Sequence, residues 1–152
     1  MDDETRFWLA QQISENRYKD DIRQMLKDGK ELTGKKPKVF ITDGAKNFHQ
    51  AFQKEFYTHK KDTRPIHIQH IHFKRDMNNN KMERMNGEIR DREKVMRGLK
   101  KKDTPILKGY EIFHNYIRPH MALDNKTPAQ ACGIEINGKN KWITLIQNAS
   151  RR

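Results

Sequence analysis

Several residue types and patterns are scarce in this sequence, and each scarcity excludes a class of protein. Cys132 is the only cysteine among the 152 residues, which excludes an internal disulfide framework and a zinc site built on several thiolates. No apolar run approaches the ~18 residues of a membrane-spanning helix, and no signal-peptide segment follows Met1. We therefore expect a soluble, intracellular protein.

Apolar and acidic residues are also limited. Hydrophobic residues make up 34% of the chain and charged residues another 34%, so the core must be modest. Seven Phe, four Tyr and two Trp still indicate a folding sequence, and the length fits one domain. The 32 Lys and Arg outnumber the 20 Asp and Glu, giving a net charge of +12. This excess makes a polyanion the default partner, although ribosomal and many unrelated proteins are equally basic.

The first part of the chain predicts strands alternating with helices. Alternating apolar residues predict a strand over Thr5–Ile13, and a helix capped by Ser14 is expected to end near Gly29 or Gly34. A short apolar strand is expected at residues 38–42. The helix after it carries apolar residues at the spacing of one helix face, namely Phe48, Ala51, Phe52 and Phe56. This alternation favours an α/β fold.

The rest of the chain is predicted to be mainly helical. The expected elements are a strand at Ile66–Phe73, helices at Asn80–Leu99 and Pro105–Ile117, a short helix closed by Gly133, and a docking turn around Trp142, Leu145 and Ile146. Thr127 followed by Pro128, with Gln130 three residues after the threonine, is a typical start of a helix.

Asp43 follows the predicted strand 38–42 and precedes Gly44. Catalytic side chains of α/β proteins gather at the carboxyl ends of strands, which makes Asp43 a candidate for chemistry. An Asx turn or a helix cap is the alternative, and local sequence alone favours it.

Glu83 is a carboxylate near the start of the predicted helix Asn80–Leu99, within a basic segment. Residues at offsets of 4, 7, 11 and 14 share its side of the helix, and these are Gly87, Arg90, Lys94 and Arg97. Glu83 is either a metal ligand beside a nucleic-acid backbone or an acidic residue favoured by the helix dipole, and local sequence alone favours the second interpretation.

Basic residues are concentrated between positions 74 and 102. This segment predicts a phosphate-contacting surface, and a solvated helix face is the alternative. The candidate DNA-binding residues are Lys74, Arg75, Lys81, Arg84, Arg90, Lys94 and Arg97. Asn78, Asn79 and Asn80 either bond phosphate or sugar, or cap the helix.

Three histidines fall on the predicted strand Ile66–Phe73. His70 and His72 share one face, whereas His67 lies on the other. Without thiolate partners a zinc site is not expected, and we interpret them as histidines beside an active site or on a strand surface.

Taken in order, these segments resemble the integrase-type DDE core domain of insertion-sequence transposases. The resemblance rests on Ile41-Thr42-Asp43-Gly44, on Glu83 within Asn78–Asn86, on Arg90 through Leu99, on Tyr116-Ile117-Arg118-Pro119-His120, and on Lys126 through Ile134. It covers nearly the whole chain.

The resemblance implies an RNase H-like fold whose Asp-Asp-Glu triad holds two Mg²⁺ or Mn²⁺ ions, which prefer oxygen ligands and promote in-line displacement at phosphorus. Asp43 matches the second acid and Glu83 the third, so both are the expected catalytic and metal-binding residues. The implied partners are transposon-end and target DNA, with a homo-oligomer possible and a cytoplasmic, nucleoid-associated location in a prokaryotic cell.

The first acid of the family has no counterpart here, because Asp2 and Asp3 match a hairpin turn. We therefore expect an RNase H-like fold without its first two strands, in an N-terminally truncated chain with little or no strand-transfer activity. The expected domains are a core at residues 1–134 and a tail with a short docking helix at residues 135–152. The expected function is that of a transposase catalytic domain in DNA transposition, and the alternative is a non-catalytic basic DNA-binding protein.

Overall fold

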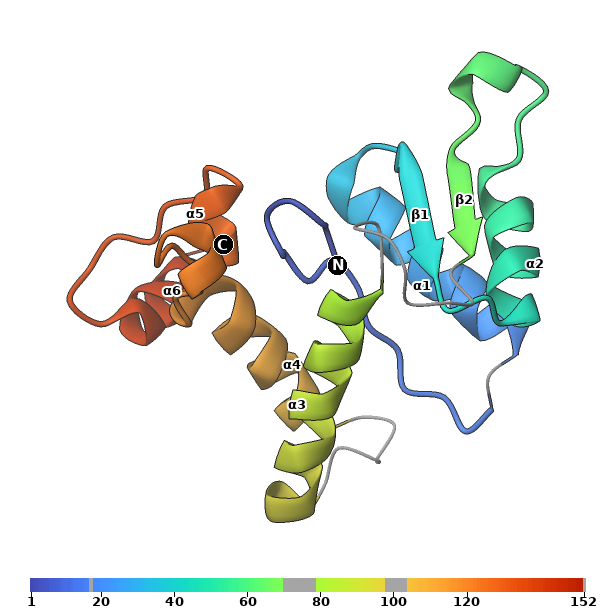
Figure 1. Cartoon of the computed structure of the whole chain (residues 1–152). Helices are drawn as coiled ribbons and strands as arrows, with labels where there is room; N and C mark the ends of the chain where they lie inside the picture. The colour runs from blue at the N-terminus through green and yellow to red at the C-terminus, as the bar shows by residue number, and fades with distance from the viewer. Residues whose placement is uncertain (17, 70–78, 98–103, 152) are drawn as a thin grey trace. The chain divides into compact units, whose positions relative to one another are not determined.

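The computed structural model describes residues 1–16, 18–69, 79–97 and 104–151 (Figure 1). Its elements are α1 (Lys19–Thr33), β1 (Val39–Thr42), α2 (Lys46–Phe56), the 3₁₀ turn η1 (Lys61–Thr63), β2 (Ile66–Gln69), α3 (Asn80–Met96), α4 (Pro105–Ile112), the π turn η2 (Phe113–Ile117), the 3₁₀ turn η3 (Met121–Leu123), α5 (Pro128–Ala131) and α6 (Lys141–Ser150). Helices and a small sheet together confirm the α/β class expected from the sequence. The chain divides into two compact units, residues 9–102 and residues 1–8 with 103–152.

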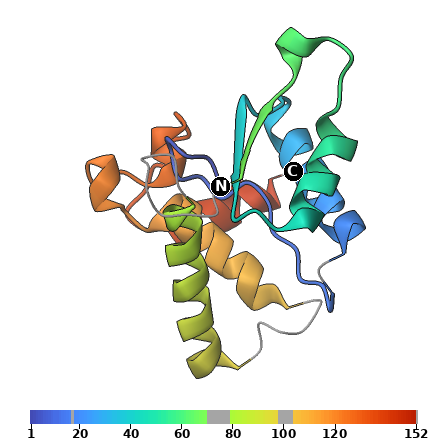
Figure 2. The same ribbon diagram turned by 45° about the vertical axis from the view of Figure 1, so that its right-hand side comes forward.

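The first of these units contains a two-stranded sheet covered by two helices. β1 and β2 run parallel, with Phe40 opposite His67 and Ile41 opposite Ile68. Figure 2 shows both α1 and α2 on the same side of the strands. Their apolar faces form a core of Ile22, Leu26, Ala51, Phe52 and Phe56, against which Phe40 packs. The predicted apolar stripe of Phe48, Ala51, Phe52 and Phe56 is therefore confirmed.

Helix α1 begins later than predicted. Its N-cap position is Tyr18, whereas Ser14 donates its hydroxyl to the Asn16 carbonyl oxygen at 2.5 Å. The predicted Ser14 cap is therefore wrong, because this hydroxyl is engaged in a local turn. The predicted end at Gly34 is confirmed, since this glycine adopts φ 63°, a left-handed backbone that favours a residue without a Cβ.

The predicted strand Thr5–Ile13 is wrong, because no strand forms in this segment. Among the described residues the sheet contains β1 and β2, and their ladder includes no residue from 5 to 13. A strand requires a neighbour for its backbone N–H and C=O groups. Trp8 instead pairs with a side chain, that of Asn115.

Helix α3 is largely exposed. Among its residues Met85 is the buried one, with 4% of its surface exposed. Asn79 occupies the N-cap position, but its side chain makes no capping hydrogen bond. The helix ends at Met96, with Arg97 in a left-handed conformation at φ 47°. The predicted ends of this helix and of the strand before it, Leu99 and Phe73, lie outside the described residues.

The second unit is built around α4 and η2. Thr104 caps α4 by accepting the N–H of Ile106, and Tyr110 packs edge-on against Trp8. The capping box predicted at Thr127 and Gln130 is present in both directions. On helix α6 the side chains of Trp142, Ile143 and Ile146 are exposed. The domain boundary predicted at residue 134 and the docking role of this helix stay predictions.

No helix within the described residues is both long and apolar enough to cross a membrane.

Candidate functional site

Asp43 lies directly after β1, at the carboxyl end of the strand, and its side chain is exposed. Its Oδ1 accepts the backbone N–H of Ala45 at 3.2 Å, an Asx turn that leads into α2. Gly44 makes this turn with φ 88°. Asp43 therefore has the predicted local turn role, and it also presents a carboxylate to solvent at the edge where α/β proteins place their chemistry.

Glu83 lies in the first turn of α3, and its side chain is exposed. Its own backbone N–H donates to the Asn79 carbonyl oxygen at 3.0 Å. An acidic residue at this position interacts favourably with the positive end of the helix dipole. The position of Glu83 is therefore compatible with both interpretations: a charge that stabilises the start of the helix, and an exposed oxygen ligand for a metal ion.

The carboxylates do not form a complete metal site in the described part of the chain. Nowhere within it do three His, Cys, Asp or Glu side chains come close enough to hold one ion. Asp43 and Glu83 offer the oxygen chemistry that Mg²⁺ and Mn²⁺ prefer, but two carboxylates are few for a pair of divalent ions. The two carboxylates therefore have the ligand chemistry that Mg²⁺ and Mn²⁺ prefer, but they are too few to hold two ions.

Exposed bases line α3 as predicted. Arg84, Arg90 and Arg97 are exposed, and no ion pair to them exists among the residues that the structure describes. Lys94 is paired with Asp91 at 2.9 Å, although both side chains remain about three-quarters exposed. Lys81 is half-buried. The predicted Lys74 and Arg75 lie outside the described residues, as do His70 and His72.

A contact between two histidines near the end of β1 was not predicted from the sequence. His67 Nε2 lies 2.9 Å from Thr42 Oγ1, and His67 Nδ1 lies 3.1 Å from His49 Nδ1. The two imidazole rings stack with their centroids 5.3 Å apart. Phe52 and Phe56 follow His49 at i+3 and i+7, so the sequence spacing already indicates that His49 lies on the apolar face of this helix. The pairing with His67 depends on the β1–β2 register, which the sequence alone does not fix.

The environment of His67 favours its neutral form. Burial against Phe40 and Phe52 lowers the pKa of His67 below its usual range, and electrostatic repulsion from His49 lowers it further. A neutral His67 can hold a hydrogen bond with Thr42 through one ring nitrogen and contact His49 through the other. The histidine pair therefore contacts the last residue of β1, which directly precedes Asp43.

The geometry agrees with an independent comparison of the sequence. The family model DDE_Tnp_IS240, described as "DDE domain", matches residues 1–120. Searches of curated proteins and of solved structures found no match. The matched residues span β1 with Asp43, α3 with Glu83 and all of the candidate basic residues. Because the model covers well over half of the chain, this protein belongs to the DDE domain family of insertion-sequence transposases.

Proposed function

We propose that this chain acts in DNA transposition as a DNA-binding DDE domain in which Asp43 and Glu83 are ligands of a divalent metal ion. The observation that carries the proposal is the family match over residues 1–120. Exposure of both carboxylates supports it, since a metal ligand must be reachable by the ion and by the phosphate it serves. We propose Mg²⁺ or Mn²⁺, because all of the ligand atoms concerned are carboxylate oxygens.

The fold supports the same proposal at a finer level. We propose that β1, α2 and β2 are part of an RNase H-like sheet, with two parallel strands joined through a helix packed on one face. In such a sheet the residue after a strand lies at the edge used for chemistry. Asp43 occupies this position after β1, and the His67–Thr42 contact holds the strand end beneath it.

DNA binding is proposed for the exposed side of α3. The guanidinium groups of Arg84, Arg90 and Arg97 can contact phosphates by charge-assisted hydrogen bonds. Such contacts read the DNA backbone rather than the bases, so they supply affinity without sequence specificity.

A second candidate function is a DNA-binding module without catalysis. The incomplete donor set favours it, because two carboxylates do not assemble a two-ion site within the described residues. On either proposal we expect the 152-residue chain alone to bind duplex DNA without cutting it. Strand cleavage that requires Mg²⁺ or Mn²⁺ and is lost in Asp43→Ala would show a complete site.

Mn²⁺ binding separates the two candidates. The measurement is calorimetric titration of the full chain with Mn²⁺, in the presence of duplex DNA, for the wild type and for Asp43→Asn and Glu83→Gln. We expect each variant to bind Mn²⁺ at least tenfold more weakly, because a neutral amide replaces an anionic ligand. Glu31→Gln is the matched control, since Glu31 is an exposed helical carboxylate paired with Lys27. Equal Mn²⁺ affinity in all four proteins would favour the non-catalytic module.

A further inference from the structure

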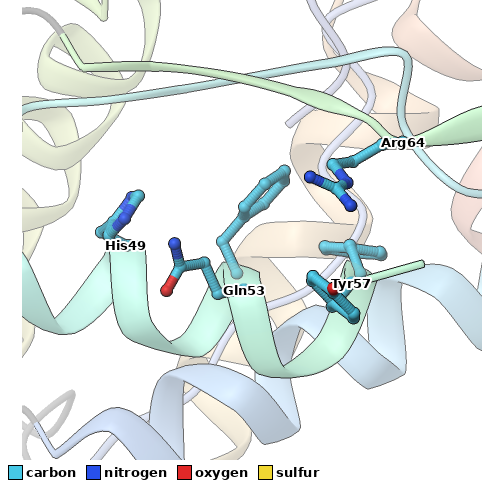
Figure 3. Close-up of a pocket in the computed structure, with 6 residues that line it drawn as sticks. His49, Gln53, Tyr57 and Arg64 are labelled. Atoms are coloured by element: carbon cyan, nitrogen blue, oxygen red, sulfur yellow. The ribbon is translucent and has the colours of Figure 1, made fainter. Parts of the chain in front are cut away.

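A small cavity lies along α2 between His49 and Tyr57. None of the candidate DNA-binding residues of α3 lines it. Its volume is about 220 Å³, and it is lined by His49, Phe52, Gln53, Phe56, Tyr57 and Arg64. Figure 3 shows Arg64 reaching toward Tyr57 from the segment before β2, with Gln53 and His49 further along the helix. A cavity of this size is below the range for drug-sized ligands and suits one planar ring system.

Arg64 and Tyr57 form a cation–π pair at one end of the cavity. The Arg64 guanidinium carbon lies 4.8 Å from the centre of the Tyr57 ring. Two of its nitrogens, Nη2 and Nε, donate to the Thr58 carbonyl oxygen at 2.8 and 3.3 Å. These bonds fix the guanidinium plane, while Tyr57 keeps 59% of its surface exposed. Such a pre-ordered aromatic and guanidinium surface is suited to stacking a nucleobase.

The loop around this pair is basic. Lys60, Lys61 and Arg64 are exposed in this loop, against one exposed carboxylate, Asp62. Glu55, the other nearby acid, is held by Arg23 and Lys30 with its side chain 7% exposed. The ligand that fits combines an anionic backbone with a flat apolar ring, which is the chemistry of a nucleic-acid strand with an unpaired base.

We propose that this cavity binds one unpaired base of a DNA strand, stacked on Tyr57 and Arg64, while Lys60 and Lys61 contact the adjoining phosphates. Phe52 and Phe56 provide an almost wholly apolar lining, which suits the flat face of a base. The proposal rests on the DNA-binding function proposed above and adds a binding site to it.

The cavity is connected to the end of β1 through a short chain of contacts. His49, at one end of the cavity, lies 3.1 Å from His67 through their Nδ1 atoms, and His67 contacts Thr42. Thr42 is the residue before Asp43. The cavity is therefore linked by contacts to the strand end that carries Asp43.

The test is fluorescence titration of the full chain with a short single-stranded oligonucleotide that contains one aminopurine, compared with the fully paired duplex. We expect Tyr57→Ala to weaken single-strand binding roughly tenfold, because one base–aromatic stack is lost. Tyr57→Phe keeps the ring and should retain wild-type affinity. Arg64→Lys keeps the positive charge but removes the planar guanidinium group. It should therefore weaken single-strand binding while leaving duplex binding unchanged.

The outcomes separate this proposal from the previous one. Wild-type and Tyr57→Ala chains with equal single-strand affinity would overturn the base site, even if duplex binding persists. A wild-type chain that binds neither single strand nor duplex would overturn the proposed DNA-binding function as well. Circular dichroism of each variant confirms folding, and failure of Tyr57→Phe to bind, with its fold intact, would also contradict the stacking role.

Discussion

The Asn115 side chain pairs with both backbone polar groups of Trp8. Its Oδ1 accepts the Trp8 N–H at 2.8 Å, and its Nδ2 donates to the Trp8 carbonyl oxygen at 3.0 Å. Asn115 is 1% exposed, so these bonds are shielded from water. One amide thus satisfies the two groups that a neighbouring strand would otherwise pair.

Loss of this amide should destabilise the unit formed by residues 1–8 and 103–152. We expect Asn115→Ala to lower the free energy of unfolding by about 3 kcal/mol, because two buried backbone groups lose their partners. Urea denaturation followed by Trp fluorescence measures the change. Asn148→Ala is the control, since Asn148 is exposed on α6 and its substitution should change stability by less than about 0.5 kcal/mol. Equal midpoints for the two variants would contradict the role of Asn115.

Glu55 should make the α1–α2 pair sensitive to acid. Burial opposes ionisation of Glu55, but hydrogen bonds and charges from Lys30 and Arg23 outweigh it and lower the pKa of this carboxyl. A lowered pKa means that the stabilisation is present above the usual value of 4.5 and is lost as pH falls through the folded-state value.

The measurement is thermal unfolding of wild type and Glu55→Gln at neutral pH and below about pH 4. We expect Glu55→Gln to cost about 1 kcal/mol at neutral pH and to be nearly neutral in acid. Glu31→Gln, which removes an exposed carboxylate from the Lys27 pair, should have little effect at either pH. If Glu55→Gln lowers stability by the same amount at both pH values, the negative charge of Glu55 does not contribute to stability.

His67 should make stability fall in mildly acidic solution. Its pKa is lowered by burial and by His49, so the unfolded chain binds a proton more readily than the folded one. Stability is therefore full above the usual value of 6.5 and is lost as pH falls through the lower folded-state pKa. Burial and the charges of His114, Arg118 and Arg6 lower the pKa of His120 too, so part of the effect belongs to that residue.

Denaturation of His67→Gln between about pH 7.5 and pH 5 isolates the contribution of His67. We expect a shallower pH dependence than in the wild type, whereas His59→Gln, at an exposed position, should keep the wild-type slope. An unchanged slope in His67→Gln would contradict a contribution of His67 to this pH dependence.

The exposed bases of α3 should control the salt dependence of DNA binding. Arg90→Gln with Arg97→Gln should reduce the slope of log K against log salt by about 0.9 for each phosphate contact removed. Fluorescence anisotropy with a labelled duplex measures the slope. Lys35→Gln with Lys36→Gln removes the same charge from an exposed loop and should leave the slope nearly unchanged. Equal salt slopes in the two double variants would show that DNA binding depends on the net charge of the protein and not on the positions of Arg90 and Arg97.

Elements specified by local sequence were predicted well. The spacing of Phe48, Phe52 and Phe56 predicted the buried face of α2, and Thr127 with Gln130 predicted a capping box, since both depend on neighbours within a few residues. The exposed positions of Asp43 and Glu83 agree with their predicted elements, while their role as metal ligands stays a prediction.

Features that depend on distant partners were not predicted. The segment Thr5–Ile13 has the alternation of a strand, but a strand also needs a paired neighbour, and Trp8 finds its partner in Asn115. Contact between His49 and His67 likewise requires the register of β1 and β2. Alternation and periodicity specify which face a residue occupies, whereas the identity of the partner comes from tertiary packing.

The grouping of residues 1–8 with residues 103–152 has a consequence for synthesis on the ribosome. Asn115 follows its partner Trp8 by 107 positions, so the nascent chain carries Trp8 long before the amide that binds it exists. In the interval α1, β1, α2 and β2 are all translated and can pack. Co-translational folding of these 152 residues should therefore begin in residues 9–102 and incorporate Trp8 later, and a chain stalled before Asn115 should leave the Trp8 indole accessible to a water-soluble quencher.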